Sequence, residues 1–257
     1  MVYDLGGKRA LVTGASAGIG AELARQLAPR VGEIWLLARD AKRLDALAAE
    51  LPIPAHVVPC DLANAEARAT TIAELERANI DILVNNAGVG RSGPIAKNPW
   101  PKIETVLDVN ITALTHLTWA LVPGMLERGH GAVLNVGSTA GIRPIPHLNV
   151  YAATKAYVDH FSRALAWELR HTGVGISLLL PSTTATEFFD RGEIPLQRPN
   201  GFVDSAATVA TAGVEAIARQ RAVATPGWKV GLLARALRWL PSSVVNRASD
   251  SVFSEDR

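Results

Sequence analysis

Tyr151 and Lys155 are the residues whose types and spacing most directly indicate chemistry, within the sequence YAATKAYVDHF. Positions i and i+4 share one face of a helix, so the phenol and the ammonium group should point the same way. A free tyrosine titrates near pH ~10, and a nearby ammonium group lowers that pKa because it favours the phenolate. The pair is therefore typical of a general acid/base that exchanges a proton with a substrate near neutral pH.

Ser138 adds a further polar group, at the end of a predicted strand, where its hydroxyl could hold a substrate oxygen. The alternative interpretation makes Tyr151 a helix-start aromatic residue and lets Lys155 extend its ammonium group to water. For an isolated Y-x-x-x-K pattern that alternative is the better one, since the pattern is common by chance. The choice between the two depends on the other motifs in the chain.

The sequence VTGASAGIG indicates a phosphate-binding turn. It follows a predicted strand and opens a predicted helix, and Gly14, Gly18 and Gly20 allow the backbone to approach a pyrophosphate closely. The free N–H groups at the helix N-terminus would bind that anion. The spacing is Gly-x-x-x-Gly-x-Gly rather than the commoner G-x-G-x-x-G, so a glycine-rich helix start without a ligand is the alternative.

The end of the second predicted strand, in LLARD, distinguishes between the two nicotinamide dinucleotides. A carboxylate here binds the ribose 2′-hydroxyl of NAD, whereas an arginine accommodates the 2′-phosphate of NADP. Ala38 ends the strand and Arg39 follows it, so the sequence predicts NADP(H) as the cofactor. A solvated Arg39 is the alternative, and Asp40 is expected to cap the next helix rather than to touch a ribose.

These residues need a scaffold, and the hydrophobic pattern predicts alternating strands and helices. Strands are predicted at Arg9–Thr13, Glu33–Ala38, Ala55–Cys60, Ile80–Val84, Ala132–Val136, Gly175–Leu180 and Ala222–Thr225. Helices are predicted at Gly18–Pro29, Ala41–Leu51, Ala63–Ala78, Ile103–Arg128, Tyr151–Thr172 and Ser205–Arg219. The strands are apolar on both faces, as parallel strands covered by helices are. The pattern predicts an α/β fold, a Rossmann-type doubly wound parallel β-sheet of about seven strands, in a single domain spanning 1–257.

The composition excludes several classes of function. Of the 257 residues, 48% are hydrophobic and 19% are charged, and the net charge of +2 argues against nucleic acid as the main partner. The one cysteine, Cys60, excludes an intramolecular disulfide and fits a reducing compartment. We find no signal peptide and no uninterrupted apolar run of about eighteen residues, so we expect no transmembrane helix and a cytoplasmic location. No metal site is predicted.

The ordered motifs together resemble those of the short-chain dehydrogenase/reductase (SDR) family, and the resemblance covers most of the chain. Thr13–Gly20 is similar to the family's T-G-x-x-x-G-x-G turn, and Asp61-Leu62 to the pair that contacts adenine. NNAG at Asn85–Gly88 resembles the motif that steadies the central sheet beside the cofactor. The positions that correspond to the family's catalytic tetrad are Asn110, Ser138, Tyr151 and Lys155.

The resemblance implies a role for each member of the tetrad. Tyr151 would be the general acid/base, and Lys155 would lower its pKa and hold the nicotinamide ribose. Ser138 would orient and polarise the substrate carbonyl, and Asn110 would fix a water that links Lys155 to solvent as a proton relay. Each residue alone has a structural alternative, but their joint occurrence favours the catalytic set.

The resemblance also implies the cofactor contacts, and it includes one departure. NADP(H) would contact Gly14, Ser16, Gly18, Ile19, Gly20, Arg39, Asp61, Leu62, Asn86, Ala87, Gly88, Tyr151, Lys155, Pro181, Thr184 and Thr186. Ser182 stands after Pro181 where the family usually has glycine, which would alter the backbone approach to the nicotinamide. Thr186 best matches the threonine that binds the carboxamide, with Thr183 and Thr184 as the other candidates.

The substrate pocket is expected to be lined by residues 89–95 and 139–150 and by a substrate loop at 183–203. Its predicted contacts are Ser138, Ile145, Leu148 and Phe188. Further apolar residues in these segments, such as Val89, Ile142 and Phe189, predict an apolar pocket. Such a pocket favours a lipophilic or aromatic ketone, or a secondary alcohol, over a phosphorylated sugar.

A C-terminal helical extension is predicted at 226–257. Within 228–240, Trp228, Trp239 and several leucines surround Lys229 and Arg235 in the pattern of an amphipathic helix that lies on a membrane surface. The preferred interpretation is a helix that covers the pocket or packs on a partner subunit, because the basic residues are few for an interfacial anchor.

The sequence therefore predicts an NADP(H)-dependent short-chain dehydrogenase/reductase that interconverts a ketone or aldehyde and an alcohol by hydride transfer. The resemblance implies a homodimer or homotetramer. Two alternatives stay open: a cofactor-binding regulatory or scaffold protein without turnover, and another reaction on the same fold, such as epimerisation or enoyl reduction.

Overall fold

The computed structural model contains one parallel sheet of seven strands, in the order β3-β2-β1-β4-β5-β6-β7. The strands are β1 (Arg9–Thr13), β2 (Glu33–Ala38), β3 (Ala55–Pro59), β4 (Ile82–Asn85), β5 (Gly131–Val136), β6 (Val174–Leu179) and β7 (Val223–Ala224). All neighbouring strands run parallel, with Thr13 opposite Leu37 and Asn85 opposite Asn135. The predicted Rossmann-type fold is confirmed, and the strand order reverses between β1 and β4, where such sheets bind ligands.

The structure describes residues 2–184, 186–188, 192, 194, 204–239, 241, 243, 246 and 247, without the side chains of 233, 237 and 238. Most of the predicted substrate loop 183–203, including Phe189, lies outside these residues. The predicted extension 226–257 is described up to residue 239 and at four positions beyond it.

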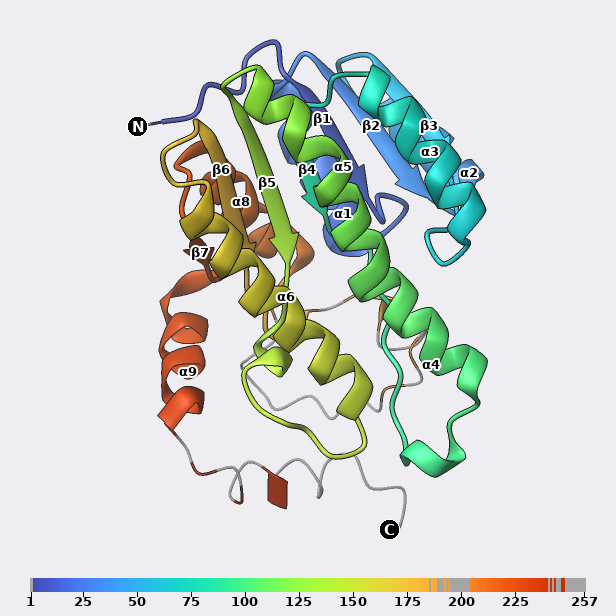
Figure 1. Ribbon diagram of the computed structural model, residues 1–257, viewed down its shortest axis with the longest axis vertical. Coiled ribbons are helices and arrows are strands. Elements are labelled where there is room, and N and C mark those ends of the chain that lie inside the picture. The colour runs from blue at the N-terminus through green and yellow to red at the C-terminus, as the bar shows by residue number, and fades with distance from the viewer. Residues whose placement is uncertain are drawn as a thin grey trace.

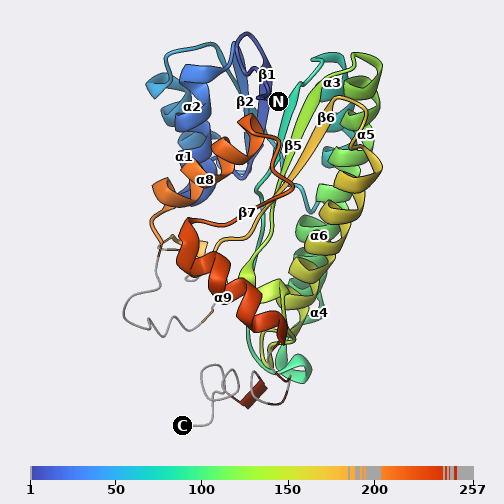
Figure 2. The same cartoon turned by 90° about the vertical axis from the view of Figure 1, so that its left-hand side faces the viewer.

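Helices cover both faces of the sheet (Figure 1). On one face lie α1 (Gly18–Leu27), α2 (Ala41–Glu50) and α8 (Ala206–Ala218), and on the other lie α3 (Ala65–Arg77), α5 (Leu114–Glu127) and α6 (Asn149–Glu168), as Figure 2 shows. Helices α4 (Trp100–Leu107) and α9 (Gly227–Trp239) lie toward the carboxyl ends of the strands (Figure 1). Short 3₁₀ turns are η1 (Ala28–Arg30), η2 (Ile95–Lys97) and η4 (Thr139–Gly141).

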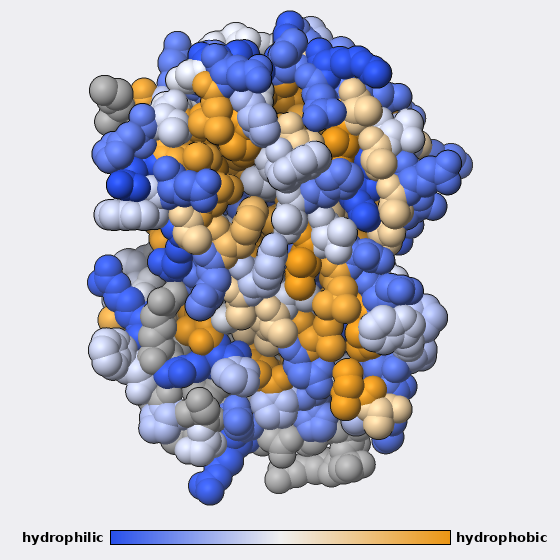
Figure 3. Space-filling view, in the orientation of Figure 1, coloured by the Kyte–Doolittle hydropathy of each residue, from blue (hydrophilic) through white to orange (hydrophobic). Residues whose placement is uncertain are grey.

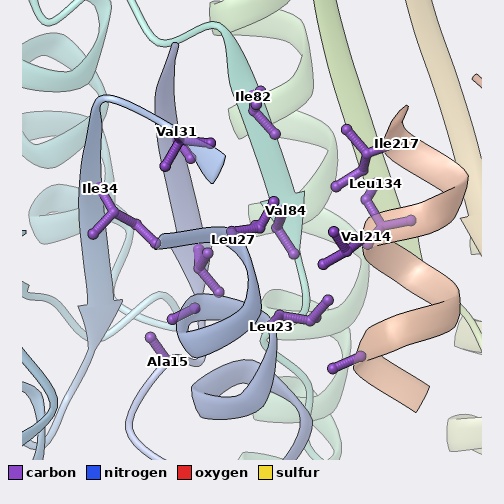
Figure 4. Packing of buried hydrophobic residues seen from close by; sticks show 14 of the residues in the cluster. Ala15, Leu23, Leu27, Val31, Ile34, Ile82, Val84, Leu134, Val214 and Ile217 are labelled. Carbon is purple, nitrogen blue, oxygen red and sulfur yellow. The ribbon is translucent and has the colours of Figure 1, made fainter. Parts of the chain in front are cut away.

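Aliphatic side chains fill the core between the sheet and helices α1 and α8 (Figure 4). Leu23 and Leu27 of α1 are fully buried in this cluster, together with Val84 of β4 and Val214 of α8. Burial of each leucine stabilises the fold by about 1.5–3 kcal/mol. This packing fixes the N-terminus of α1 at the carboxyl end of β1, where the glycine turn connects them.

Strand β3 differs from the expectation that the strands are apolar on both faces. Its residues are half-buried or exposed, and His56 and Pro59 are exposed, whereas every residue of β4 and β5 is buried. The reason is position, because β3 is the edge strand of the sheet and pairs with β2 alone.

The long helix predicted at Ile103–Arg128 is present as one helical run, Trp100–Glu127, with a π-helical segment inside it. Between α4 and α5 lies a π-helical segment, η3 (Asp108–Ala113), and such segments occur frequently at functional sites. Among the described residues, the run Trp100–Glu127 has the length and composition of a membrane span, with a mean hydropathy of 1.2, but 56% of that window is buried. Burial of this extent is typical of a core helix.

Candidate active site

A cleft of about 1010 Å³ lies where the turns and loops that follow β1 to β6 meet α6. All of the predicted cofactor contacts, from Gly14 to Thr186, line this cleft. The predicted substrate contacts line it too: Ser138, Ile145, Leu148 and Phe188. Asn110 does not line the cleft, so it can act there only through other residues.

The glycine turn has the backbone geometry that a pyrophosphate requires. Gly14 and Gly18 adopt positive φ angles of 65° and 55°, which favour glycine, and a Cβ at Gly20 would collide with the Gly14 carbonyl oxygen. Ala17 caps α1 without a side-chain hydrogen bond, and the first turn of α1 contains no acidic residue. The positive end of α1 therefore faces the cleft, and the turn fits a pyrophosphate.

Thr13 and Asn86 brace this turn, and sequence reasoning did not assign them that role. The Thr13 hydroxyl donates to the Val84 carbonyl oxygen at 3.1 Å and accepts from the N–H groups of Asn86 and Ala87 at 3.0 Å each. The Asn86 side-chain Nδ2 donates to the Thr13 carbonyl oxygen at 2.8 Å. The ends of β1 and β4 are thus tied together directly beneath the cleft.

Arg39 is the cation at the end of β2. Its side chain is exposed and lines the cleft, and none of the described residues forms an ion pair with it. Asp40 caps α2 as predicted, because its Oδ1 accepts from the Arg43 N–H at 3.1 Å. The Arg43 guanidinium donates to Glu187 at 2.9 Å, and this contact raises the pKa of Arg43. Of these two arginines, Arg39 is thus the one that fits a 2′-phosphate.

Ser138, Tyr151 and Lys155 meet in the cleft. The hydroxyl groups of Ser138 and Tyr151 are hydrogen-bonded to each other. The Lys155 Nζ lies 5.9 Å from the centre of the Tyr151 ring and donates to the Val136 carbonyl oxygen at 2.8 Å. Tyr151 and Lys155 are both buried, at 8% and 5% exposure, so little solvent surrounds the phenol and the ammonium group.

Burial dominates the titration of this pair. Burial raises the pKa of Tyr151 to about 12, and the hydrogen bond with Ser138 lowers it only in part. Burial also lowers the pKa of Lys155 to about 8. The loss of solvent around the phenol is the dominant effect on its pKa, and the lowering of that pKa by Lys155 stays a prediction. At neutral pH, Tyr151 is a neutral phenol that still carries its proton.

Asn110 lies in the π-helical segment η3, and its side chain connects the loop at Val89 to helix α6. Its Nδ2 donates to the Val89 carbonyl oxygen at 2.9 Å and to the Thr154 hydroxyl at 3.0 Å, and its Oδ1 accepts from the Val89 N–H at 2.9 Å. A Cβ added at Gly88 would lie 3.4 Å from this Oδ1 and 3.5 Å from the Lys155 Nζ. Asn110 and Lys155 are therefore neighbours, and the proton relay between them stays a prediction.

Gly141 is a further residue that the sequence reasoning missed. A Cβ at Gly141 would lie 2.5 Å from the backbone carbon of Lys155 and 2.7 Å from the Ala156 nitrogen. Only glycine therefore allows the turn η4, which begins after Ser138, to pack directly on the backbone of α6. The STAG sequence around Gly141 carries a signal for a turn, but no signal for this close approach.

The loop after β6 accepts Ser182 in place of the family's usual glycine. Ser182 is not among the described residues with a positive φ, and its hydroxyl donates to Asp204 Oδ2 at 2.8 Å. The buried Thr184 donates its hydroxyl to the Ser182 carbonyl oxygen at 3.1 Å. Thr186 packs over the glycine turn, where a Cβ added at Gly18 would lie 3.0 Å from the Thr186 Cγ2. Serine therefore fits without backbone strain.

A family model and several known proteins are similar to this chain. The family model described as short chain dehydrogenase matches residues 8–193. The NADP-dependent 3-hydroxy acid dehydrogenase YdfG of Escherichia coli (strain K12) is 40% identical over 182 residues, covering 69% of this chain and 73% of that protein. A short-chain dehydrogenase from Sphingobium yanoikuyae, solved in complex with NADPH, has a TM-score of 0.83 and 34% identity, covering 97% of this chain and 96% of that one. The bulky-bulky ketone specific alcohol dehydrogenase from Comamonas testosteroni has a TM-score of 0.79 and 30% identity, covering 97% and 95%.

Proposed function

Because the chain belongs to the short chain dehydrogenase family, we propose that it is an NADP(H)-dependent oxidoreductase that interconverts a ketone or aldehyde and an alcohol. The observation that carries the proposal is the meeting of Ser138, Tyr151 and Lys155 in the same cleft as the glycine turn. The glycine turn and the N-terminus of α1 would hold the pyrophosphate, and Arg39 would hold the 2′-phosphate.

The bound cofactor would supply the hydride in reduction and accept it in oxidation. Tyr151 donates its phenolic proton to the carbonyl oxygen, which Ser138 holds within reach through the same hydroxyl cluster. The Lys155 ammonium group stabilises the negative charge that develops on the Tyr151 oxygen as the proton leaves. Because burial raises the pKa of Tyr151 to about 12, the phenol carries the proton that reduction requires at neutral pH.

The substrate proposed for this site is lipophilic or aromatic. Leu148, Tyr151 and Ile194 form a buried apolar cluster, against which Ile145 and Phe188 pack. The rings of Tyr151 and Phe188 lie 5.4 Å apart. A carbonyl carbon next to Tyr151 would thus have apolar substituents on this side.

The loss of NADPH absorbance with a panel of lipophilic and aromatic ketones tests the proposed function. Turnover with NADPH supports a ketone reductase. Tight NADPH binding without turnover of any ketone, but with turnover of α,β-unsaturated carbonyl compounds, would instead indicate an enoyl reductase. Binding without any turnover, in either substrate class, would favour the regulatory alternative.

Replacing Arg39 with glutamine is expected to reduce the preference for NADPH over NADH by about tenfold to hundredfold, because one charge-assisted contact to the 2′-phosphate is lost. The measurement is kcat/KM for each cofactor with one ketone. Arg30→Gln is the matched control, because Arg30 is exposed and does not line the cleft. An unchanged preference in Arg39→Gln would show that Arg39 does not bind the 2′-phosphate.

The helix predicted at 228–240 is present as α9, and it is amphipathic. Trp228, Leu232 and Trp239 are 75%, 60% and 89% exposed, whereas Val230 and Ala234 are buried. No described residue of α9 lines the cleft, so this part of the chain does not cover the pocket. Contact with a membrane surface or a partner subunit stays a proposal for its exposed face.

A second exposed apolar face supports a homo-oligomer, which we propose to be a homodimer or homotetramer. Trp119 of α5 and Trp167 of α6 are each 71% exposed, and the face formed by these helices carries apolar patches among hydrophilic side chains (Figure 3). The double variant Trp119→Glu/Trp167→Glu is expected to reduce the mass in light scattering to that of one chain, 27.3 kDa, because carboxylates would be buried in the interface.

The double variant Trp228→Glu/Trp239→Glu on α9 is the matched control and is expected to keep the assembly. If it dissociates the assembly instead, α9 forms the interface and our assignment to α5 and α6 is wrong. Sedimentation of both variants with anionic lipid vesicles tests the membrane proposal, since only the α9 variant should lose vesicle binding.

We propose that residues 1–257 form one cytoplasmic domain. One sheet connects all seven strands, and Cys60 is a buried free thiol, as expected in a reducing compartment. The small-molecule substrate enters between the described segments that line the cleft, with 183–203 as its substrate loop and 226–257 as an extension.

A further inference from the structure

Arg68 is a cation at a position where the helical pattern favours an apolar residue. It belongs to α3, whose other buried positions, Thr71, Ile72 and Leu75, follow it with the period of a helix. Arg68 is only 6% exposed, and it lies near the N-terminus of α3, where the helix dipole disfavours a cation. Burial of a charge here is costly, so a specific contact must compensate for it.

That contact is a hydrogen bond to the turn between β3 and α3. The Arg68 Nη1 donates to the Leu62 carbonyl oxygen at 2.6 Å. Among the hydrogen bonds of the described residues, this is the only one that the Leu62 carbonyl oxygen accepts. A charge-assisted hydrogen bond is stronger than one between neutral groups, so Arg68 fixes the orientation of the peptide group that joins Leu62 to Ala63.

The same peptide group connects Arg68 to the carboxylate of Asp61. Its N–H, on Ala63, donates to Asp61 Oδ1 at 3.1 Å. The Asn64 N–H donates to the Asp61 carbonyl oxygen at 3.0 Å, and Asn64 Oδ1 caps α3 by accepting from the Ala67 N–H at 2.9 Å. These bonds are local to the turn, whereas Arg68 ties the turn to the buried side of α3. Arg68 therefore helps to hold the Asp61 carboxylate through the backbone.

The turn lines the cleft, and Arg68 does not. Asp61 and Leu62 are among the lining residues, at the end of the cleft that follows β3. Asp61 is exposed, and within the described part of the chain nothing donates to its Oδ2. A donor on a ligand can therefore bind this oxygen, and its position depends on the peptide group that Arg68 fixes.

We propose that Arg68 is a positioning residue that gives the site its selectivity for adenine. Through the peptide group between Leu62 and Ala63, it holds Asp61 where Oδ2 accepts from the 6-amino group of the adenine of NADP(H). The inference rests on the proposed function, in which NADP(H) occupies the cleft, and it adds a residue that does not touch the cofactor. A purine with an oxygen at position 6 would place an acceptor against the carboxylate and bind more weakly.

Two cofactors that differ at position 6 of the purine test the proposal. They are NADPH and reduced nicotinamide hypoxanthine dinucleotide phosphate, which carries an oxygen in place of the amino group. The dissociation constants are measured by fluorescence titration, so the test requires neither a substrate nor turnover. We expect the wild-type protein to bind NADPH about tenfold to hundredfold more tightly than the hypoxanthine analogue, because one charge-assisted hydrogen bond is lost with the analogue.

Arg68→Met is expected to reduce this preference by about tenfold, because the peptide group loses its charge-assisted contact. Methionine is apolar and of similar length, so it suits the buried side of α3. Arg68→Lys keeps a cation that can donate to the Leu62 carbonyl oxygen, and it should keep most of the preference. Arg77→Met, at the exposed end of α3 and outside the cleft, is the matched control and should not change the preference.

Two further measurements separate positioning from a merely structural role. Loss of stability alone would not change the ratio of the two dissociation constants. Asp61→Ala should abolish the preference for adenine, and Arg68→Met added to it should change the ratio no further, because both residues act on one contact. In ketone reduction, Arg68→Met should raise KM for NADPH more than it lowers kcat, since Tyr151 belongs to α6 and not to this turn.

An unchanged ratio in Arg68→Met overturns the role of Arg68. If that variant does not fold, Arg68→Gln replaces it, because the glutamine side chain ends before the position of Nη1. Wild-type protein that binds both cofactors equally well overturns the adenine selectivity and leaves the proposed function intact. Wild-type protein that binds neither cofactor contradicts the proposed function itself.

Discussion

Replacement of Tyr151 by phenylalanine is expected to lower kcat for ketone reduction by about 10²–10⁴-fold, the range that a general acid contributes. The variant removes only the hydroxyl that donates the proton and that is hydrogen-bonded to Ser138. The cofactor-binding turn and Arg39 are untouched, so the dissociation constant of NADPH, measured by fluorescence titration, should stay within a few-fold of its original value.

Tyr157 supplies a matched control on the same helix. Its hydroxyl is hydrogen-bonded to the Thr115 hydroxyl at 2.9 Å, and Tyr157 does not line the cleft. Tyr157→Phe therefore removes a comparable hydroxyl from α6 without removing a proton donor from the cleft, and its kcat should be close to that of the wild-type enzyme. A Tyr151→Phe variant that retains full turnover would exclude Tyr151 as the acid, and one that no longer binds NADPH would show a structural role.

The rate of ketone reduction is expected to fall at alkaline pH, where Lys155 loses its proton. Burial lowers its pKa to about 8, so its charge is present below that pH and is lost as the pH rises through it. Because the ammonium group stabilises the charge that develops on Tyr151, kcat should be constant below pH about 8 and should fall above it. In Lys155→Met we expect kcat at neutral pH to fall by about a hundredfold and the inflection to disappear.

The effect of Lys155 on the free energy of unfolding should depend on pH with the opposite sign to its effect on kcat. The unfolded lysine titrates at 10.5 and the folded one at about 8, so between these values the unfolded chain binds more protons at this site. The free energy of unfolding should therefore gain a contribution from Lys155 as pH rises through this window, and Lys155→Met should lack it. Lys229→Met, on the exposed side of α9, should change neither profile. A wild-type rate that does not depend on pH between 7 and 10 would contradict the assigned role of Lys155.

Local sequence patterns predicted the strands and the glycine turn well. β1 and β2 have the predicted bounds, and α1 begins at the predicted Gly18. These elements depend on periodic burial and on glycine conformations, which are properties of a few adjacent residues. The helix predicted at Ile103–Arg128 is confirmed as one helical run, Trp100–Glu127, but the hydrophobic period persists across η3 and gives no sign of the π-helical segment.

Packing between distant segments is where sequence reasoning failed. Gly141 approaches the backbone of Lys155, and Thr13 accepts hydrogen bonds from the chain at Asn86, more than seventy residues away. Such contacts depend on how the sheet and α6 pack together, and no local sequence pattern predicts them. The same holds for Arg91 and Arg143, which the sequence places far apart and the fold places at one cavity.

The sequence by itself determined the parallel α/β fold, the cofactor turn and the identity of the residues that could exchange a proton. It determined these because residue type and short-range spacing decide backbone conformation and functional groups. The tertiary structure alone decided that burial dominates the pKa values of Tyr151 and Lys155. Both depend on burial and on distances across the fold, because the free energy of a charge is set by the solvent and the charges around it.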